Sequence, residues 1–246
     1  MIGLQLYSLK EMAEKDFLGT LEKVGKVGFD GVEFAGYFGT PSKDLKEALD
    51  HYGLKAAGSH IGIEDLEKNL NKVIEYSLEI ENPSVICPGL PEDYRNSAEA
   101  YKRTAEFFNR VGERCKQNGV LFGYHNHDFE FQTFEGKTGL QHLIDETEDD
   151  HVFFELDTYW AEVCGIPSVE LIHQLKDRCK WLHLKDMNNW NEKRNVEVGN
   201  GVLDWEEIVS KGKSQSVDWY TIEQEAFDID QMESIEISLR YLRGIL

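Results

Sequence analysis

The segment "FGYHNHDFEF", residues 122–131, places four side chains that can bind a metal or move a proton within six positions. They are His125, His127, Asp128 and Glu130. An imidazole titrates near neutrality, so a histidine here suits a metal ligand or a general base, and the segment leaves open which histidine does which. Glu130 either orients a neighbouring histidine or contacts substrate. A polar surface loop is the alternative, but Phe129 and Phe131 indicate partial burial.

Other apolar runs of the chain end in the same kinds of side chain. In chain order these are Gln5 and Tyr7, Glu33, His60, Glu155 and Asp157, His183 and Lys185, and Glu223 and Glu225. Alternate residues of a strand point to one face, so the two members of each late pair lie on the same side. A buried carboxylate that lacks a partner costs roughly 3 to 5 kcal/mol. One cation bound by Asp157, His183 and Glu223 therefore explains their placement better than three separate structural roles. Those roles would be a turn at Asp157, a hydrogen-bonded core histidine at His183 and an isolated acid at Glu223.

The chemistry of this donor set narrows the choice of cation. Mixed imidazole and carboxylate ligands suit Mn2+, Co2+, Fe2+ or Zn2+, whereas an all-oxygen set suits Mg2+ or Ca2+. We favour Mn2+, with Mg2+, Co2+, Fe2+ and Zn2+ as alternatives. A catalytic ion keeps positions open for substrate oxygens, so three or four protein ligands are enough.

Eight short apolar runs, separated by segments of helical periodicity, must position these side chains. The runs are "IGLQLY", "GVEFAG", "LKAAGSH", "SVICPG", "VLFGYHNH", "VFFELD", "KWLHLKD" and "WYTIEQE". Between them, residues 65–78 and 98–117 repeat apolar residues every three or four positions, and Gly53 and Gly119 can close helices. This alternation predicts a (β/α)8 TIM barrel in one domain over residues 1–246, with an open doubly wound sheet as the alternative.

The composition excludes several classes of partner. The formal charge of -20, from 46 acidic and 26 basic residues, repels nucleic acids and anionic membrane surfaces. Four scattered cysteines form no CxxC pair, and neither an export signal nor an apolar run of about 18 residues is found. We therefore expect a cytoplasmic protein that acts on a small molecule, and the sequence leaves open whether it forms a homo-oligomer.

The polar segment 186–201 reads as a loop over the site. Its glycines, Gly199 and Gly201, have two readings. Their backbone N–H groups could bind a phosphate, since barrel phosphate sites often lie near the last two strands. A plain turn followed by a helix that Asp204 caps is the reading we favour.

The order of "ELDTYW", "WLHLKD" and "TIEQEAF" at strand ends resembles the xylose isomerase-like, sugar phosphate isomerase/epimerase superfamily. The resemblance extends over nearly the whole chain and implies a divalent-metal barrel that acts on a sugar or polyol. It places metal ligands at Asp157, His183 and Glu223. The family's usual glutamate after the fifth strand is replaced here by His125, which we expect to be the fourth ligand.

The chemistry of the remaining side chains suggests further roles. Glu223 and His127 are the candidate proton carriers, with His60 as the alternative to His127, and Lys185 would stabilise negative charge on a substrate oxygen. The candidate substrate contacts are Tyr7, Glu33, His60, Glu155 and Trp160. Glu155 alternatively pairs with Lys185, and Trp160 alternatively packs in the core.

Three functions are compatible with these residues. The first is a metal-dependent sugar or sugar phosphate isomerase or epimerase that acts through an enediolate. The second is a lyase or dehydratase of a keto-sugar or inosose, favoured by the histidine that replaces one of the two acid-base glutamates. The third is a non-catalytic sugar-binding or accessory subunit.

Overall fold

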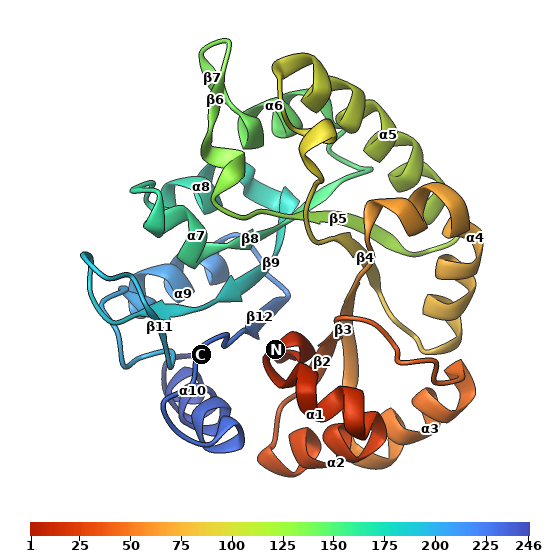
Figure 1. Cartoon of the computed structure of the whole chain (residues 1–246), viewed down its shortest axis with the longest axis vertical. Coiled ribbons are helices and arrows are strands. Elements are labelled where there is room, and N and C mark those ends of the chain that lie inside the picture. Colours follow the sequence, from red (N-terminus) through yellow and green to blue (C-terminus); the bar gives the residue numbers. More distant parts are fainter.

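Eight parallel strands close into a barrel in the computed structural model, which describes all residues 1–246 (Figure 1). In chain order the strands are β1 (Ile2–Gln5), β2 (Gly31–Phe34), β3 (Lys55–His60), β4 (Ser84–Cys87), β5 (Leu121–His125), β8 (Phe153–Asp157), β9 (Cys179–Leu184) and β12 (Trp219–Ile222). Around the barrel the order is β1-β12-β9-β8-β5-β4-β3-β2. The predicted TIM barrel is confirmed, each apolar run contributes one strand, and the open sheet is wrong.

Helices surround this barrel and return the chain from one strand to the next. They are α1 (Lys10–Lys15), α2 (Phe17–Val27), α3 (Ser42–Tyr52), α4 (Ile63–Glu79), α5 (Ala98–Lys116), α6 (Gly139–Glu146), α7 (Thr158–Val163), α8 (Ser168–Leu175), α9 (Trp205–Ser214) and α10 (Gln231–Ile245). The two helices predicted from periodicity are α4 and α5, within two residues at each end. None of these helices combines the length and the apolar character needed to cross a bilayer.

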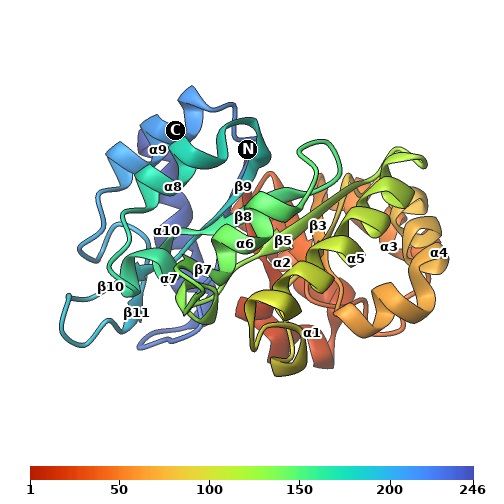
Figure 2. The ribbon, with the colours of Figure 1, turned by 90° about the horizontal axis from the view of Figure 1, so that it is seen from above.

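Short elements follow some strands at the end of the barrel where strands finish. They are the hairpins β6–β7 (Thr133–Phe134 and Lys137–Thr138) and β10–β11 (Asp186–Met187 and Asn195–Val196), and the 3-10 turns η1 (Leu6–Leu9) and η3 (Phe129–Phe131). Two further 3-10 turns are η2 (Glu92–Tyr94) and η4 (Lys176–Arg178). Figure 2 shows the hairpins at one end of the barrel and both chain termini at the other.

The helix α5 illustrates how the sequence specifies the outer layer. Ser97 accepts a hydrogen bond from the backbone N–H of Ala100 and so caps its first turn. Its apolar residues recur at helical spacing, and Tyr101, Phe108 and Cys115 are completely buried. They join a core of 54 buried residues that includes strand residues such as Phe122 and Tyr124. This packing holds the strand ends in place.

The inward face of the barrel changes from apolar to polar along the strands. Phe153, Trp181 and Trp219 are buried with Ala57 and Ile86 in a separate cluster at the beginning of the strands. The rings fit because other strands of the barrel carry glycine: a Cβ at position 123 would lie 2.5 Å from the Phe153 ring, and one at position 31 would lie 2.6 Å from Trp219. Aromatic rings therefore close this end of the barrel, and polar side chains occupy the other.

The segment 186–204 is held by the single carboxylate of Asp186, which is completely buried. It accepts hydrogen bonds from the backbone N–H groups of Met187, Gly199, Gly201 and Leu203 and from the indole N–H of Trp205, over 2.6 to 3.2 Å. The two glycine N–H groups are therefore unavailable to a phosphate, and that reading is wrong. The predicted turn and the Asp204 cap are confirmed, since Asp204 accepts from the N–H of Glu207 at 3.0 Å.

Replacement of Asp186 by alanine should destabilise the fold strongly. It would leave five buried or partly buried donors without an acceptor, and we expect the free energy of unfolding to fall by at least about 3 kcal/mol. Asp204→Ala is the matched control, because loss of one helix cap costs about 1 kcal/mol. Urea denaturation measures both variants. Equal losses would contradict a central role of the Asp186 carboxylate.

Candidate functional site

Four donors from neighbouring strands converge where the polar half of the barrel begins. They are His125 at the end of β5, Asp157 at the end of β8, His183 in β9, and Glu223 directly after β12. Their donor atoms all lie within 4.8 Å of one another, and all four residues are buried. The barrel thus brings together the four side chains that the sequence predicts as metal ligands.

Two further carboxylates fix the orientation of the two imidazoles. Glu155 Oε2 lies 3.1 Å from His125 Nδ1, and Glu33 Oε2 lies 2.6 Å from His183 Nε2. The opposite nitrogens face the donor set, with His125 Nε2 3.8 Å from Asp157 Oδ2 and His183 Nδ1 3.1 Å from Glu223 Oε2. A carboxylate that accepts the outer N–H of a ligand histidine fixes its tautomer and strengthens it as a ligand.

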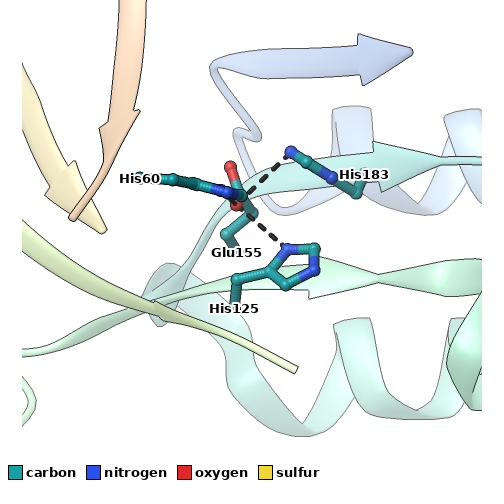
Figure 3. Close-up of side chains that lie close together, drawn as sticks. All are labelled: His60, His125, Glu155 and His183. Atoms are coloured by element: carbon teal, nitrogen blue, oxygen red, sulfur yellow. Dashed lines mark hydrogen bonds and ion pairs between the residues drawn. The ribbon is translucent and has the colours of Figure 1, made fainter. Parts of the chain in front are cut away.

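A second group, His60, His125, Glu155 and His183, also brings its donors within 4.8 Å (Figure 3). His60 Nε2 lies 2.8 Å from Glu155 Oε2 and 3.1 Å from Glu33 Oε2. Burial alone would lower the pKa of His60, but these two carboxylates raise it to about 9. A protonated His60 therefore already supplies a positive charge to this second group.

The first group fits a divalent ion better than the second. Asp157 Oδ2 is buried and has no hydrogen-bond partner, and it lies 3.2 Å from the ammonium of Lys185. The donors combine two imidazoles with two carboxylates, which suits Mn2+ and its first-row neighbours. Burial raises the pKa of Asp157 despite the nearby charges of Lys185 and His183, which act in the opposite direction.

Lys185 is buried among carboxylates at the edge of this group. Its ammonium lies 2.7 Å from Glu223 Oε2 and 2.5 Å from Glu225 Oε1. Although burial opposes the charge, the carboxylates of Asp157, Glu223 and Glu225 raise the pKa of Lys185 well above its usual value. The alternative prediction of a pair with Glu155 is not what the structure shows, because Glu155 contacts three histidines instead.

A cavity of about 350 Å3 opens above these donors. It is lined by Tyr7, Ala35, His60, Pro88, His125, His127, Trp160, Glu223 and Glu225. Three of the five expected substrate contacts, Tyr7, His60 and Trp160, are thus in its wall. Glu33 and Glu155 are completely buried beneath it and make contacts with histidines, so the structure gives them a supporting position.

The largest cavity, about 650 Å3, lies at the opposite end of the barrel beside Trp181 and Trp219. Its walls are mainly apolar and bring together no metal-binding group. Functional groups of parallel barrels lie at the carboxyl ends of the strands. We therefore assign the functional site to the smaller cavity, because the candidate metal ligands lie beneath it.

His127 lies in the cavity wall beside His125, with ring centroids 4.9 Å apart. It stacks on Phe129 at 5.4 Å, and its Nδ1 is buried without a hydrogen-bond partner. Burial, together with the nearby charge of Lys185, lowers the pKa of His127 to about 4. The ring is therefore neutral at pH 7, and its Nδ1 has no partner inside the protein. It is absent from both metal-binding groups, which distinguishes it from His125.

The Glu130 carboxylate fixes the backbone at His127 through a hydrogen bond. Its Oε2 accepts the His127 N–H at 2.7 Å, and its other oxygen accepts from the Tyr124 hydroxyl. Burial raises the pKa of Glu130 from its ordinary value of 4.5 to about 7. Of the two roles the sequence left open for Glu130, the structure places it in the orienting one.

The raised pKa of Glu130 makes stability depend on pH. Between pH 4.5 and 7 the folded state keeps a proton that the unfolded state has lost, so stability falls as pH rises through this window, by up to about 3 kcal/mol. Glu130→Gln can accept the His127 N–H through its amide oxygen and donate its amide N–H to the Tyr124 hydroxyl oxygen. It should abolish this loss, becoming more stable relative to wild type at pH 8 than at pH 5. Denaturant titrations at both values measure the difference. For the exposed control Glu135→Gln, the stability difference from wild type should be the same at both pH values. The same result for Glu130→Gln would contradict this account.

Sequence reasoning missed one contributor to the site, Asn126, and gave no role to another, Glu225. Asn126 accepts the backbone N–H of Asp157 at 3.0 Å and so ties β5 to β8 beside the ligands. Glu225 lines the cavity and pairs with Lys185. The signal for Glu225 was its position two residues after Glu223. For Asn126 the only signal was its place between two histidines.

Comparisons with known proteins agree with the barrel fold. The profile of the "Xylose isomerase-like TIM barrel" family matches residues 21–245. A sugar phosphate isomerase/epimerase from Parabacteroides distasonis is 29% identical, with 99% of this chain and 93% of that chain covered and a TM-score of 0.86. D-allulose 3-epimerase from Methylomonas, 14% identical, shares the fold with a TM-score of 0.78 over 100% of this chain and 97% of that chain.

Among curated proteins, inosose dehydratase of Geobacillus kaustophilus is 22% identical over 191 residues. The match covers 69% of this chain but 61% of that relative, so this chain spans less than two thirds of its length. The family profile covers most of the chain, including every donor described above. The chain therefore belongs to the xylose isomerase-like TIM barrel family.

Proposed function

We propose that the protein is a divalent-metal-dependent sugar isomerase or epimerase, with Mn2+ as the favoured ion. The observation that carries the proposal is the convergence of His125, Asp157, His183 and Glu223 beneath a cavity of about 350 Å3. Bound there, the ion would polarise a substrate carbonyl, make the neighbouring C–H more acidic and stabilise the enediolate.

The chain's own residues bind the sugar and move the proton. Tyr7 and Trp160 offer aromatic faces to the apolar side of a sugar ring. His127 is neutral and unpaired, so its imidazole accepts the carbon-bound proton and returns it. Glu223 is the weaker candidate, because Lys185 and His183 hold the pKa of its carboxylate far below its ordinary range despite burial. The ammonium of Lys185 offsets negative charge that develops on the substrate.

Exchange with solvent tests this proposal directly. The Mn2+-loaded protein is incubated with a panel of ketoses in D2O, and carbon-bound deuterium is followed by NMR and mass spectrometry. Isomerisation or epimerisation through an enediolate introduces deuterium next to the carbonyl. The absence of deuterium uptake by every ketose of a broad panel would contradict the proposal.

Elimination from the same intermediate is the second candidate function. It is supported by His125, which stands where an acid-base glutamate was expected, and by the similarity to proteins named inosose dehydratase. Product masses separate the two reactions, because a dehydratase product has lost water and an epimerisation product keeps its mass. A sugar-binding subunit would instead show ligand-induced thermal stabilisation without turnover.

A further inference from the structure

We propose that the cavity takes an uncharged sugar and rejects a sugar phosphate. This inference rests on the proposed function and names the substrate class of that same site. Three observations carry it: the amides that would bind phosphate are used internally, the cavity wall contains no lysine or arginine, and two carboxylates face the cavity.

The backbone donors at the usual phosphate position are engaged elsewhere. Gly199 and Gly201 both donate to Asp186 Oδ2, at 3.0 and 3.1 Å. The Gly201 backbone approaches this carboxylate so closely that an added Cβ would lie 2.1 Å from Asp186 Oδ1. Asp186 thus occupies, within the protein, the place that a phosphate oxygen would need. A phosphate there would have to displace a buried carboxylate.

No lysine or arginine belongs to the nine residues of the cavity wall. The nearest cation on the same strand end, Lys185, is 1% exposed and is held by Asp157, Glu223 and Glu225. Arg194, on the loop beyond, pairs with Asp228 through both of its terminal nitrogens. Lys10, at the outer side of the wall, donates to the Tyr7 hydroxyl at 3.2 Å. Phosphate recognition normally uses an unpaired arginine or lysine, and the wall provides none.

The wall instead presents two carboxylates and aromatic surface. Glu223 and Glu225 both face the cavity, and the Glu225 side chain is 40% exposed. A phosphate dianion in this volume would lie close to two carboxylates, within a chain of net charge -20. A free sugar meets no such repulsion. Its hydroxyls can donate to these carboxylates, and its ring can pack on Tyr7 and Trp160.

Isothermal titration with matched pairs tests the inference. The Mn2+-loaded protein is titrated with D-ribulose and D-ribulose 5-phosphate, and with D-fructose and D-fructose 6-phosphate. The members of each pair present the same carbonyl chemistry, so the ratio of their Kd values isolates the phosphate. We expect each phosphate to bind at least about tenfold more weakly than its parent sugar. Equal or tighter binding of the phosphates would overturn the inference.

Two variants locate the cause of the discrimination. Glu225→Gln removes one charge from the wall and should reduce the ratio of Kd values, and Glu225→Lys should reduce it further. Asp150→Asn removes the same charge from the exposed pair with Lys116 and should leave the ratio unchanged. Circular dichroism melts verify that each variant is folded. An equal effect of Asp150→Asn would attribute the discrimination to net charge and overturn the local account.

The outcomes for this inference and for the proposed function differ. Tighter binding of the free sugars without deuterium exchange would support the substrate class and overturn the isomerase proposal. Exchange with the phosphorylated ketoses alone would support the isomerase and overturn the substrate class. No binding by any free sugar would overturn both.

Discussion

Replacement of His125 by alanine is expected to lower the affinity for Mn2+ by at least about 100-fold. Loss of a residue that only hydrogen-bonds to a metal ligand already costs about 10- to 100-fold in affinity. Deuterium uptake should disappear with the metal. The structure supports this result because the His125 Nε2 faces Asp157 while Glu155 holds the Nδ1 side of the ring. Equilibrium dialysis with metal analysis measures the affinity.

His127→Ala is the matched comparison, since it removes a second imidazole two residues away. His127 belongs to neither metal-binding group, so the affinity for Mn2+ should remain nearly unchanged. Deuterium uptake should fall by about 100- to 10,000-fold, as expected when a general base is lost. The reverse pattern, with metal lost in His127→Ala and retained in His125→Ala, would contradict the assignment of the two histidines.

Addition of Mn2+ should stabilise the fold by an amount that mass action fixes. At a free concentration near 1,000 times Kd, the free energy of unfolding increases by about 4 kcal/mol. For a chain of this size the midpoint of thermal unfolding should then rise by about 8 to 16 °C. The physical reason is that the ion offsets the charge of buried carboxylates such as that of Asp157, whose Oδ2 has no hydrogen-bond partner. Differential scanning calorimetry with and without chelator measures the shift.

Two variants test whether the shift comes from this site. Asp157→Asn removes a charged ligand and should abolish most of the stabilisation by Mn2+. Asp150→Asn changes an exposed acid paired with Lys116 and should keep all of it. A shift of the same size in Asp157→Asn would place the ion elsewhere, and no shift in the wild-type protein would remove the basis for a metal site.

The barrel and the donor set were predictable because both depend on short-range periodicity. Each strand is a local apolar run, and alternation by two residues sets which side chains share a face. Asp157, His183 and Glu223 come from three strands of a parallel barrel, so closure alone brings their ends together. The same rule brings the end of β5 to this site, but it does not separate His125 from His127, which alternation by two residues places on one face.

The supporting contacts were not predictable, because they join distant parts of the chain in ways that only side-chain packing decides. Glu33 reaches His183 across 150 positions, and nothing in "GVEFAG" distinguishes this carboxylate from a substrate contact. The five donors that Asp186 holds include an indole 19 positions away, so the loop's glycines could be interpreted as a phosphate site. Short-range patterns predict which functional side chains lie at strand ends, whereas side-chain packing decides which of them are free to contact a ligand.

The aromatic rings of Phe153, Trp181 and Trp219 bear on how a reactant enters the cavity and how a product leaves it. They are buried inside the barrel, and none of the three lines the cavity of about 350 Å3. We therefore expect reactant and product to use the same opening, past Tyr7 and Trp160. The product therefore has to depart before a new reactant arrives, and accumulated product will compete directly for the vacant cavity.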